Sequence, residues 1–359
     1  MDIKLHIYEV NSLKTHVFSV DNFVDESLIY PQIFEAANFL RRDELVAFPT
    51  ETVYGLGANA KSTAAVEKIF QAKGRPSDNP LIVHIASIEQ LHEIACEIPD
   101  LAYTLMNHFW PGPLTIVLKK KEGISEKVTA GLDTVAVRMP AHPVALALIR
   151  ASGLPIAAPS ANRSGRPSPT IAKHVLDDLE GKIAAIVDGG ATGIGVESTV
   201  VDCTQPVPVI LRPGGVTKEE MEQIVGEVRI DPGLEEKEAT PKSPGMKYTH
   251  YAPQAPLIVV KGSPSFLQTL IDKQKTEGKK VGVLTTEEQR HHYNADVVLT
   301  CGRRSDLSTV AHRLYDVLRQ FDETDVDLIY SESFSSEGIG AAIMNRLMKA
   351  AGQQQIVEK

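Results

Sequence analysis

Two cations that flank a glycine, Lys73 and Arg75, are the residues whose type and spacing first suggest chemistry. They follow a segment at 62–73 whose apolar spacing predicts a helix, and Gly74 should end that helix. A turn stiffened by prolines comes next and contains Asn79. Cations and an amide at one helix end can bind phosphate oxygens, although a cation there can equally stabilise the helix dipole. The grouping favours a site for a phosphorylated ligand.

A second candidate group lies inside two strand-like patterns. Arg138 belongs to the alternating stretch TVAVRM, and His84 interrupts the apolar run LIVHI. An arginine in an otherwise apolar strand needs an anionic partner, which could be a protein carboxylate or a ligand. A histidine in a buried strand is more often a hydrogen-bonded core residue than a catalyst. The sequence leaves both alternatives open.

Polar residues also follow several shorter predicted strands. The segment 159–169 is dense in hydroxyl, amide and guanidinium groups, and strands are expected at 198–202 and 209–211. No cluster has the spacing of metal ligands, and no Ser-His-Asp arrangement stands out. We therefore expect no metal held by protein side chains, and any Mg²⁺ should arrive on the phosphates of a ligand.

The stretch after the predicted strand at 46–48 resembles two phosphate-binding motifs without satisfying either. Gly55, Gly57 and Ala60 imitate a dinucleotide fingerprint, but polar residues interrupt the strand before them. The same stretch lacks the second glycine of a P-loop. We expect it to be a glycine-rich loop that a ligand can approach closely.

The chain length of 359 residues predicts two domains. We expect a first domain at 1–230, a linker rich in charges and prolines at 231–256, and a second domain at 257–359. Strand and helix patterns alternate in the last segment, which predicts a small parallel, doubly wound domain that a helix at 339–351 closes.

Composition excludes several classes of protein. Hydrophobic residues make up 43% and charged residues 23% of the chain, as in ordinary globular proteins. The net charge of −9 argues against a polyelectrolyte-type nucleic-acid binder. Three scattered cysteines argue against a disulfide framework and fit a reducing compartment. With no signal-peptide pattern and no long apolar run, we expect a cytoplasmic protein without membrane contact.

Taken together, the motifs resemble those of the YrdC-type threonylcarbamoyl-AMP synthases. The matching segments occur in one order: FPTETVYGLGANA, KGRPSDNPLIVHI, FWPGPLT, TVAVRMP, PIAAPSANRSGRPSPT, ESTVVD and LRPGG. SPGMKYTHYAP and GIGAAIMNRLMKAA resemble the long, two-domain form of the family. The resemblance implies an open, twisted α/β sheet with a concave positive face, followed by a smaller Rossmann-like parallel α/β domain.

The resemblance also implies a nucleotidyltransferase reaction. L-threonine, bicarbonate or CO₂, and ATP would give L-threonylcarbamoyladenylate and pyrophosphate, with Mg²⁺ entering on ATP and no tightly bound organic cofactor. A downstream transferase complex would then modify the adenosine beside the anticodon of tRNA. Whether the chain itself binds tRNA or double-stranded RNA stays open.

By the same resemblance, site residues can be assigned to each substrate. The residues implied for threonine are Thr52, His84, Arg138, the Ala158 backbone and Ser198. Those implied for ATP are Arg75, Asn79, Thr134, Ser160, Ser168, Arg212 and Tyr251. Lys73 would lie beside the phosphates, and Lys73, Arg75 and Arg138 would stabilise the charges that develop in the reaction. Tyr251 would make the linker a lid over the nucleotide rather than an idle tether.

Two other functions are weighed against this one. The positive face could bind RNA without chemistry, but an amino-acid pocket would then serve no purpose. A hydrogenase-maturation carbamoyl transferase shares a YrdC-like module, yet the acylphosphatase and zinc-finger modules that precede it there have no counterpart in this sequence.

Overall fold

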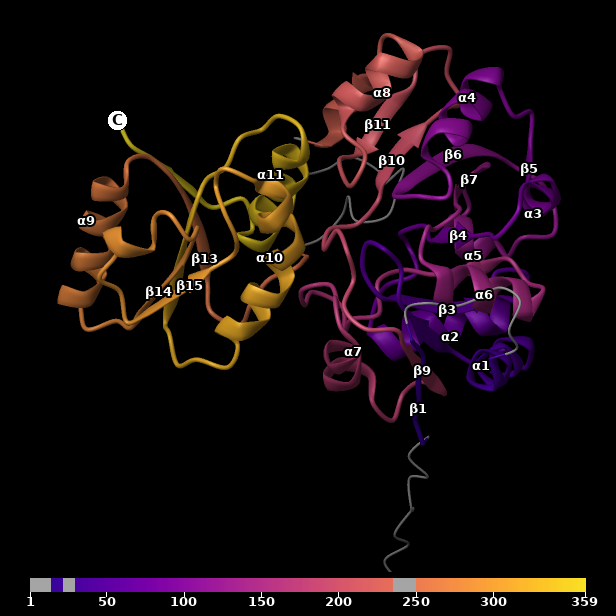
Figure 1. The fold of residues 1–359 in the computed structure, drawn as a ribbon, viewed down its shortest axis with the longest axis horizontal. Helices are drawn as coiled ribbons and strands as arrows, with labels where there is room; N and C mark the ends of the chain where they lie inside the picture. Colours follow the sequence, from indigo (N-terminus) through magenta and orange to yellow (C-terminus); the bar gives the residue numbers. More distant parts are fainter. Residues whose placement is uncertain (1–13, 22–29, 235–249) are drawn as a thin grey trace, which may run out of the picture.

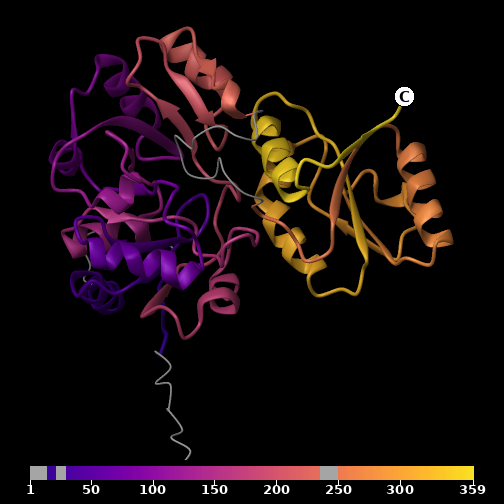
Figure 2. The same ribbon diagram turned by 180° about the vertical axis from the view of Figure 1, so that it is seen from behind.

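The computed structural model consists of two α/β domains that lie side by side (Figures 1 and 2). The structure describes residues 14–21, 30–234 and 250–359. The first domain contains a mixed sheet of 12 strands, and the second contains a sheet of five parallel strands. This confirms the predicted fold class. Residues 235–249, most of the predicted linker, lie outside the described residues.

The first domain alternates short strands with helices. Its strands are β1 (His16–Ser19), β2 (Val46–Phe48), β3 (Gly55–Asn59), β4 (Ile82–His84), β5 (Ala95–Cys96), β6 (Leu114–Lys120), β7 (Thr134–Arg138), β8 (Ile156–Ala157), β9 (Ala185–Asp188), β10 (Thr199–Asp202), β11 (Val209–Arg212) and β12 (Arg229–Ile230). Its helices are α1 (Pro31–Arg41), α2 (Thr63–Lys73), α3 (Ile88–Ile94), α4 (Asp100–Phe109), α5 (Glu126–Thr129), α6 (Pro143–Ser152), α7 (Ala172–Leu179), α8 (Lys218–Val225) and the 3₁₀ turn η1 (Pro232–Leu234).

The strand order brings distant segments together at the centre of the sheet. The order is β1-β9-β2-β3-β8-β4-β7-β6-β10-β11-β12, with β5 beside β6. β4 and β7 are parallel neighbours, and so are β6 and β10. Because β6 and β7 are antiparallel, the ends of β4 and β7 lie at the same edge of the sheet as the starts of β6 and β10.

The expectation of a glycine-rich loop at Gly55 and Gly57 is wrong, because both glycines belong to β3, which pairs with β2. A Cβ atom at Gly57 would lie 2.8 Å from the side chains of Phe48 and Ile156. Packing within the first domain therefore explains Gly57, and no ligand is needed to account for it.

The second domain is a parallel sheet with helices on both faces. Its elements are β13 (Leu257–Lys261), α9 (Pro264–Thr276), β14 (Val281–Thr285), the 3₁₀ turn η2 (Arg290–His292), β15 (Val297–Thr300), α10 (Leu307–Phe321), β16 (Leu328–Glu332), α11 (Ile339–Ala350) and β17 (Gln355–Val357). The strand order is β15-β14-β16-β13-β17. α11 does not close the domain as expected, since β17 follows it and pairs with β13.

Helices α10 and α11 lie between the second sheet and the first domain (Figures 1 and 2). Arg319 of α10 forms a 2.7 Å ion pair with Asp178 of α7. Asp322, which follows α10, forms a 3.0 Å ion pair with Arg166 of the first domain. The backbones also touch. Gly195 has a φ of +85°, and a Cβ atom there would lie 2.4 Å from the carbonyl oxygen of Ala311. The two domains therefore form a close interface.

Candidate active site

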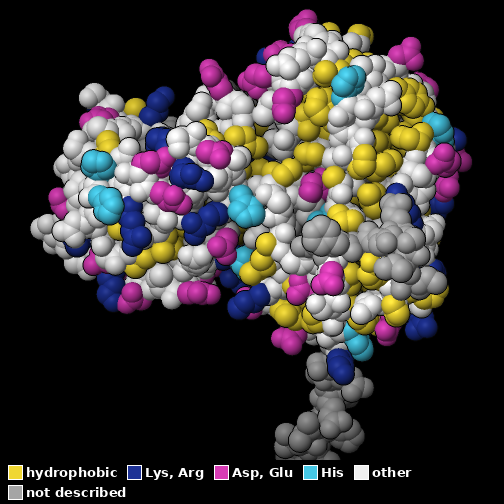
Figure 3. All heavy atoms as spheres, in the orientation of Figure 1, with side chains coloured by type: hydrophobic (Ala, Val, Ile, Leu, Met, Phe, Trp, Pro, Cys, Tyr) yellow, Lys and Arg dark blue, Asp and Glu magenta, His cyan; other side chains and the backbone are white. Residues whose placement is uncertain are grey.

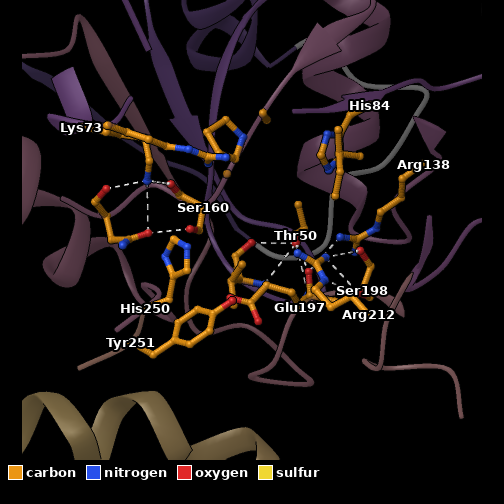
Figure 4. Close-up of a pocket in the computed structure, with 18 of the residues that line it drawn as sticks. Thr50, Lys73, His84, Arg138, Ser160, Glu197, Ser198, Arg212, His250 and Tyr251 are labelled. Atoms are coloured by element: carbon orange, nitrogen blue, oxygen red, sulfur yellow. Dashed lines mark hydrogen bonds between the residues drawn. The ribbon is translucent and has the colours of Figure 1, made fainter. Parts of the chain in front are cut away.

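A pocket at the edge of the first sheet collects most of the predicted site residues (Figure 4). Those that line it are Thr52, Lys73, Arg75, His84, Arg138, Ala158, Ser160, Ser198, Arg212 and Tyr251. Three others, Asn79, Thr134 and Ser168, do not line it. The pocket draws on the first domain and on the described end of the linker, and Figure 4 shows a helix of the second domain next to Tyr251.

Arg138 is held at the carboxyl end of β7, where His84 of β4 is its register partner. Its guanidinium forms a 2.5 Å ion pair with Glu51 and donates a hydrogen bond of 3.0 Å to the Thr52 hydroxyl. It also donates a hydrogen bond of 3.2 Å to the Gly112 carbonyl oxygen. The anionic partner seen in the structure is thus a protein carboxylate, one of the two alternatives that the sequence left open. These contacts fix the direction of the guanidinium.

His84 is buried, and its ring meets that of Phe48 edge-on at 6.1 Å. Its Nδ1 atom is buried without a hydrogen-bond partner among the described residues. Burial, together with the charge of Arg138, lowers the pKa of His84 to about 3. The imidazole is therefore neutral at physiological pH, and it can donate or accept one hydrogen bond to a ligand.

This pKa predicts a loss of stability in mild acid. The unfolded chain takes up a proton at His84 below pH 6.5, whereas the folded protein does not do so until about pH 3. The free energy of unfolding should therefore fall as the pH is lowered through this window. Urea unfolding measured from about pH 7 to about pH 4 should show a shallower decline in the free energy of unfolding for His84→Asn than for the wild type. Equal slopes of unfolding free energy against pH for the two proteins would contradict the prediction. As a second readout, the NMR shifts of the His84 imidazole should stay constant above about pH 5.

Lys73 ends α2, whose boundaries follow from local sequence. The Ser62 hydroxyl accepts from the Ala65 N–H at the first turn, and Gly74 ends the helix with a φ of +60°. Lys73 Nζ donates to the carbonyl oxygens of Ser160 and Asn162 at 2.5 and 2.6 Å. Burial and the charge of Arg75 lower the pKa of Lys73 well below its usual value. Lys73 therefore ties the end of α2 to the polar loop after β8.

Arg212 and Ser198 form the opposite wall. Arg212 donates to the Ser198 carbonyl oxygen at 2.9 Å and to its hydroxyl at 3.1 Å. Gly214 packs directly on the same backbone, because a Cβ atom there would lie 2.3 Å from the carbonyl oxygen of Glu197. The loop after β11 is thus held tightly against the start of β10.

The three predicted residues outside the lining lie nearby in different settings. The Ser168 hydroxyl donates a hydrogen bond of 2.6 Å to the carboxylate of Glu197, which does line the pocket. Asn79 is buried, accepts a 3.2 Å hydrogen bond from Arg75 through its carbonyl oxygen, and has no hydrogen-bond partner for its side-chain amide among the described residues. Thr134 begins β7, at the end of that strand opposite Arg138. Its place gives no direct support to its expected role.

Several lining residues were not predicted, namely Thr50, Glu197, Asn162, Ser164 and His250. Glu197 is the most consequential of them, because Arg346 and Tyr315 of the second domain contact its carboxylate at 2.7 and 2.8 Å. Its position directly before Ser198, inside the motif ESTVVD, is the signal that could have identified it. His250 precedes Tyr251 in the same way.

The pocket combines cations, hydroxyls and amides, a set that suits phosphate and carboxylate oxygens. Among residues 14–21, 30–234 and 250–359, no group of three or more His, Cys, Asp or Glu side chains could hold a metal ion. In the same part of the chain, no helix is long and apolar enough to cross a membrane.

Comparison with known proteins identifies the family. A family model described as "Telomere recombination" matches residues 38–214, and one described as "Threonylcarbamoyl-AMP synthase, C-terminal domain" matches residues 216–352. The threonylcarbamoyl-AMP synthase of Bacillus subtilis is 61% identical over 345 residues, covering 96% of this chain and 100% of that protein. The chain belongs to the threonylcarbamoyl-AMP synthase family. It has the two-domain form, as the sequence motifs predicted.

Structures and shorter relatives add detail about this family. The crystal structure of Pyrococcus abyssi Sua5 complexed with L-threonine has a TM-score of 0.90 and 52% identity, and covers 96% of this chain and 100% of that chain. A synthase-family relative in Mycobacterium tuberculosis is 37% identical over 194 residues, which are 54% of this chain but 89% of that protein. The family therefore includes shorter members that correspond to the first domain.

Proposed function

We propose that this protein synthesises L-threonylcarbamoyladenylate and pyrophosphate from L-threonine, bicarbonate or CO₂, and ATP. The observation that carries the proposal is a single pocket with two sets of anion-binding groups. His84 and Arg138 end neighbouring parallel strands, while Lys73 and Arg75 lie at the end of α2. Figure 4 shows Lys73 and Arg138 on opposite sides of this space. Two anionic reactants could therefore be held facing each other.

The threonine side would use Thr52, His84, Arg138, the Ala158 backbone and Ser198. Arg138 suits the carboxylate of an amino acid, because its guanidinium is already fixed by Glu51 and Thr52. Threonine bound to the related Pyrococcus protein supports this choice of substrate. Serine differs from threonine by one methyl group, so discrimination between them should amount to ~1–3 kcal/mol.

The ATP side would use Arg75, Asn79, Thr134, Ser160, Ser168, Arg212 and Tyr251. The side-chain amide of Asn79 is buried next to Arg75 and has no hydrogen-bond partner in the part of the chain that the structure describes, which supports a polar ligand there. Mg²⁺ would enter on the phosphates, since the pocket carboxylate Glu197 is already engaged by Arg346, Tyr315 and Ser168. We infer that no organic cofactor is held tightly.

The chemistry needs no covalent enzyme intermediate. The threonine amine takes up CO₂ to form a carbamate and loses a proton, or takes up bicarbonate with loss of water. A carbamate oxygen then attacks the α-phosphorus of ATP, and the bond to pyrophosphate breaks. Lys73, Arg75 and Arg138 would screen the repulsion between the two anions and align them.

The product would pass to an enzyme that transfers the threonylcarbamoyl group to the adenosine beside the anticodon of tRNA, in the cytoplasm. RNA binding without chemistry is the rival function. On the face shown in Figure 3, hydrophobic and uncharged atoms cover most of the first domain, and no continuous basic surface is seen there. Lys73, Arg75, Arg138 and Arg212 line the pocket instead, which favours small anions over an RNA backbone.

The decisive experiment measures pyrophosphate release from ATP and bicarbonate with and without L-threonine. We expect release to depend on L-threonine, with a smaller response to L-serine, and the adenylate should be detected by mass spectrometry. Pyrophosphate release that does not respond to threonine would overturn the proposed function. D-threonine is a matched control, because it carries the same groups in the wrong geometry.

A further inference from the structure

Residues 193–195, the connecting segment, lie between the second domain and the threonine side of the pocket. On one side of the segment, Nδ1 of His312 in α10 is 2.8 Å from the carbonyl oxygen of Gly193. Because a carbonyl oxygen can only accept, Nδ1 must carry the proton and donate the hydrogen bond. Gly195 lies against the same helix, with a φ of +85° and no room for a Cβ atom beside Ala311. The connecting segment is therefore fixed to the second domain by a side chain and by backbone packing.

On its other side, the connecting segment holds the backbone of Glu51 and Thr52. The N–H of Ile194 donates a hydrogen bond of 2.8 Å to the carbonyl oxygen of Glu51, and the N–H of Gly195 donates one of 3.1 Å to that of Thr52. These are the two residues whose side chains contact the guanidinium of Arg138. A continuous set of contacts thus leads from α10 to Arg138.

The direction of the Arg138 guanidinium decides how well it can hold a carboxylate. Among the described residues, Nη1 donates to Thr52, Nη2 to Glu51 and Nε to Gly112. This leaves a second N–H on each of the two terminal nitrogens for a ligand. A planar, two-pronged donor of this kind binds a carboxylate well only in one orientation. A small displacement of Glu51 and Thr52 would therefore weaken binding at Arg138.

We propose that His312 is a positioning residue for threonine binding, which acts through the connecting segment on Glu51 and Thr52 and so on Arg138. His312 does not line the pocket itself, so it can act only through these neighbours. The proposal rests on the proposed function for the identity of the ligand. It gives the second domain a part in holding the amino-acid substrate.

A matched pair of variants tests the hydrogen bond from His312. The side chain is exposed, so both variants should fold. His312→Leu cannot donate to Gly193, and calorimetry on the full-length protein should show about three- to tenfold weaker binding of L-threonine, the worth of one hydrogen bond. His312→Asn has nearly the shape of the leucine variant, but its side-chain N–H can donate to the same carbonyl oxygen. It should bind L-threonine within about twofold of the wild type.

Two readouts distinguish this role from general support of the domain interface. The affinity of His312→Leu for a non-hydrolysable ATP analogue with Mg²⁺ should stay within about twofold of the wild type, because Lys73 and Arg138 lie on opposite sides of the pocket (Figure 4). Asp322→Asn weakens another contact across the interface, the ion pair with Arg166, and should leave the affinity for L-threonine unchanged. Equal losses in the leucine and asparagine variants would overturn the proposal. So would wild-type affinity of His312→Leu for L-threonine, or an equal loss for both ligands.

NMR of the protein without ligand follows Arg138 directly. Its buried Nε–H, which donates to Gly112, should exchange with water at least about threefold faster in His312→Leu than in the wild type or in His312→Asn. The signal is assigned by its loss in Arg138→Lys. An unchanged exchange rate would overturn the proposal. A wild type that neither binds L-threonine nor releases pyrophosphate with it would refute the proposed function, while this exchange rate would still decide whether His312 positions Arg138.

Discussion

Replacing Arg138 with alanine is expected to lower kcat/KM for L-threonine by about 30- to 900-fold, a loss of ~2–4 kcal/mol of transition-state stabilisation. The reason is that Arg138 would hold the threonine carboxylate or the carbamate in a fixed direction. Its side chain is buried at the end of β7 and oriented by Glu51 and Thr52. The measurement is threonine-dependent pyrophosphate release, with the threonine concentration varied.

Two variants distinguish loss of chemistry from loss of structure. Arg138→Lys keeps the charge but loses the planar fork, so its kcat/KM should lie between those of Arg138→Ala and the wild type. Arg75→Ala should raise the KM for ATP more than that for threonine. Because Arg138→Ala leaves Glu51 without its ion pair, the unfolding temperature and the affinity for an ATP analogue should be measured as well. Wild-type kcat/KM in a folded Arg138→Ala protein would disprove its role.

Ending the chain after residue 234 is expected to leave a folded first domain that synthesises product about 100-fold more slowly or worse. The cut removes Tyr251 from the pocket, where it is buried, stacks on Tyr315 at 5.1 Å and lies beneath Arg346 at 5.7 Å. Shorter members of the family support the expectation that the first domain folds. Circular dichroism and pyrophosphate release are the two measurements.

Tyr251→Ala in the full chain is the matched comparison. Tyr251 has a φ of +67°, a conformation that is rare for a large side chain and that here accompanies tight packing. If the linker acts as a lid, this single change should reproduce part of the loss and raise the KM for ATP. Full activity of the shortened chain would mean that the linker is only a tether.

The parts of the fold that sequence could predict are those with strong local signals. Helix α2 has a serine cap and a terminal glycine, and the central strands are continuous apolar runs. β3 was missed because its glycines follow from a tertiary cause, the packing of Gly57 against Phe48 and Ile156. β17 was missed because it is three residues long and half-buried at most. Short exposed strands depend on their partner rather than on their own sequence.

The site shows the same division. His84 and Arg138 could be singled out because a polar residue in an apolar strand is a local anomaly, whereas Arg212 was assigned by the family resemblance alone. Their family resemblance assigned them to ligands, which the geometry of the pocket alone does not do. Glu197 could not be predicted in this way, since the partners that define its role, Tyr315 and Arg346, lie 118 and 149 residues further along the chain.

The close contact at Gly195 has a consequence for how the domains can move. Its Cα lies against the α10 backbone at Ala311 and His312, with no space for a side chain between them. Surfaces in such contact cannot slide past each other, because the neighbouring side chains of α10 would collide with the loop. Relative motion would therefore be a hinge rather than a shear. Such a hinge would part Glu197 from both Arg346 and Tyr315 in one step, so that the two contacts would be made or lost as a unit.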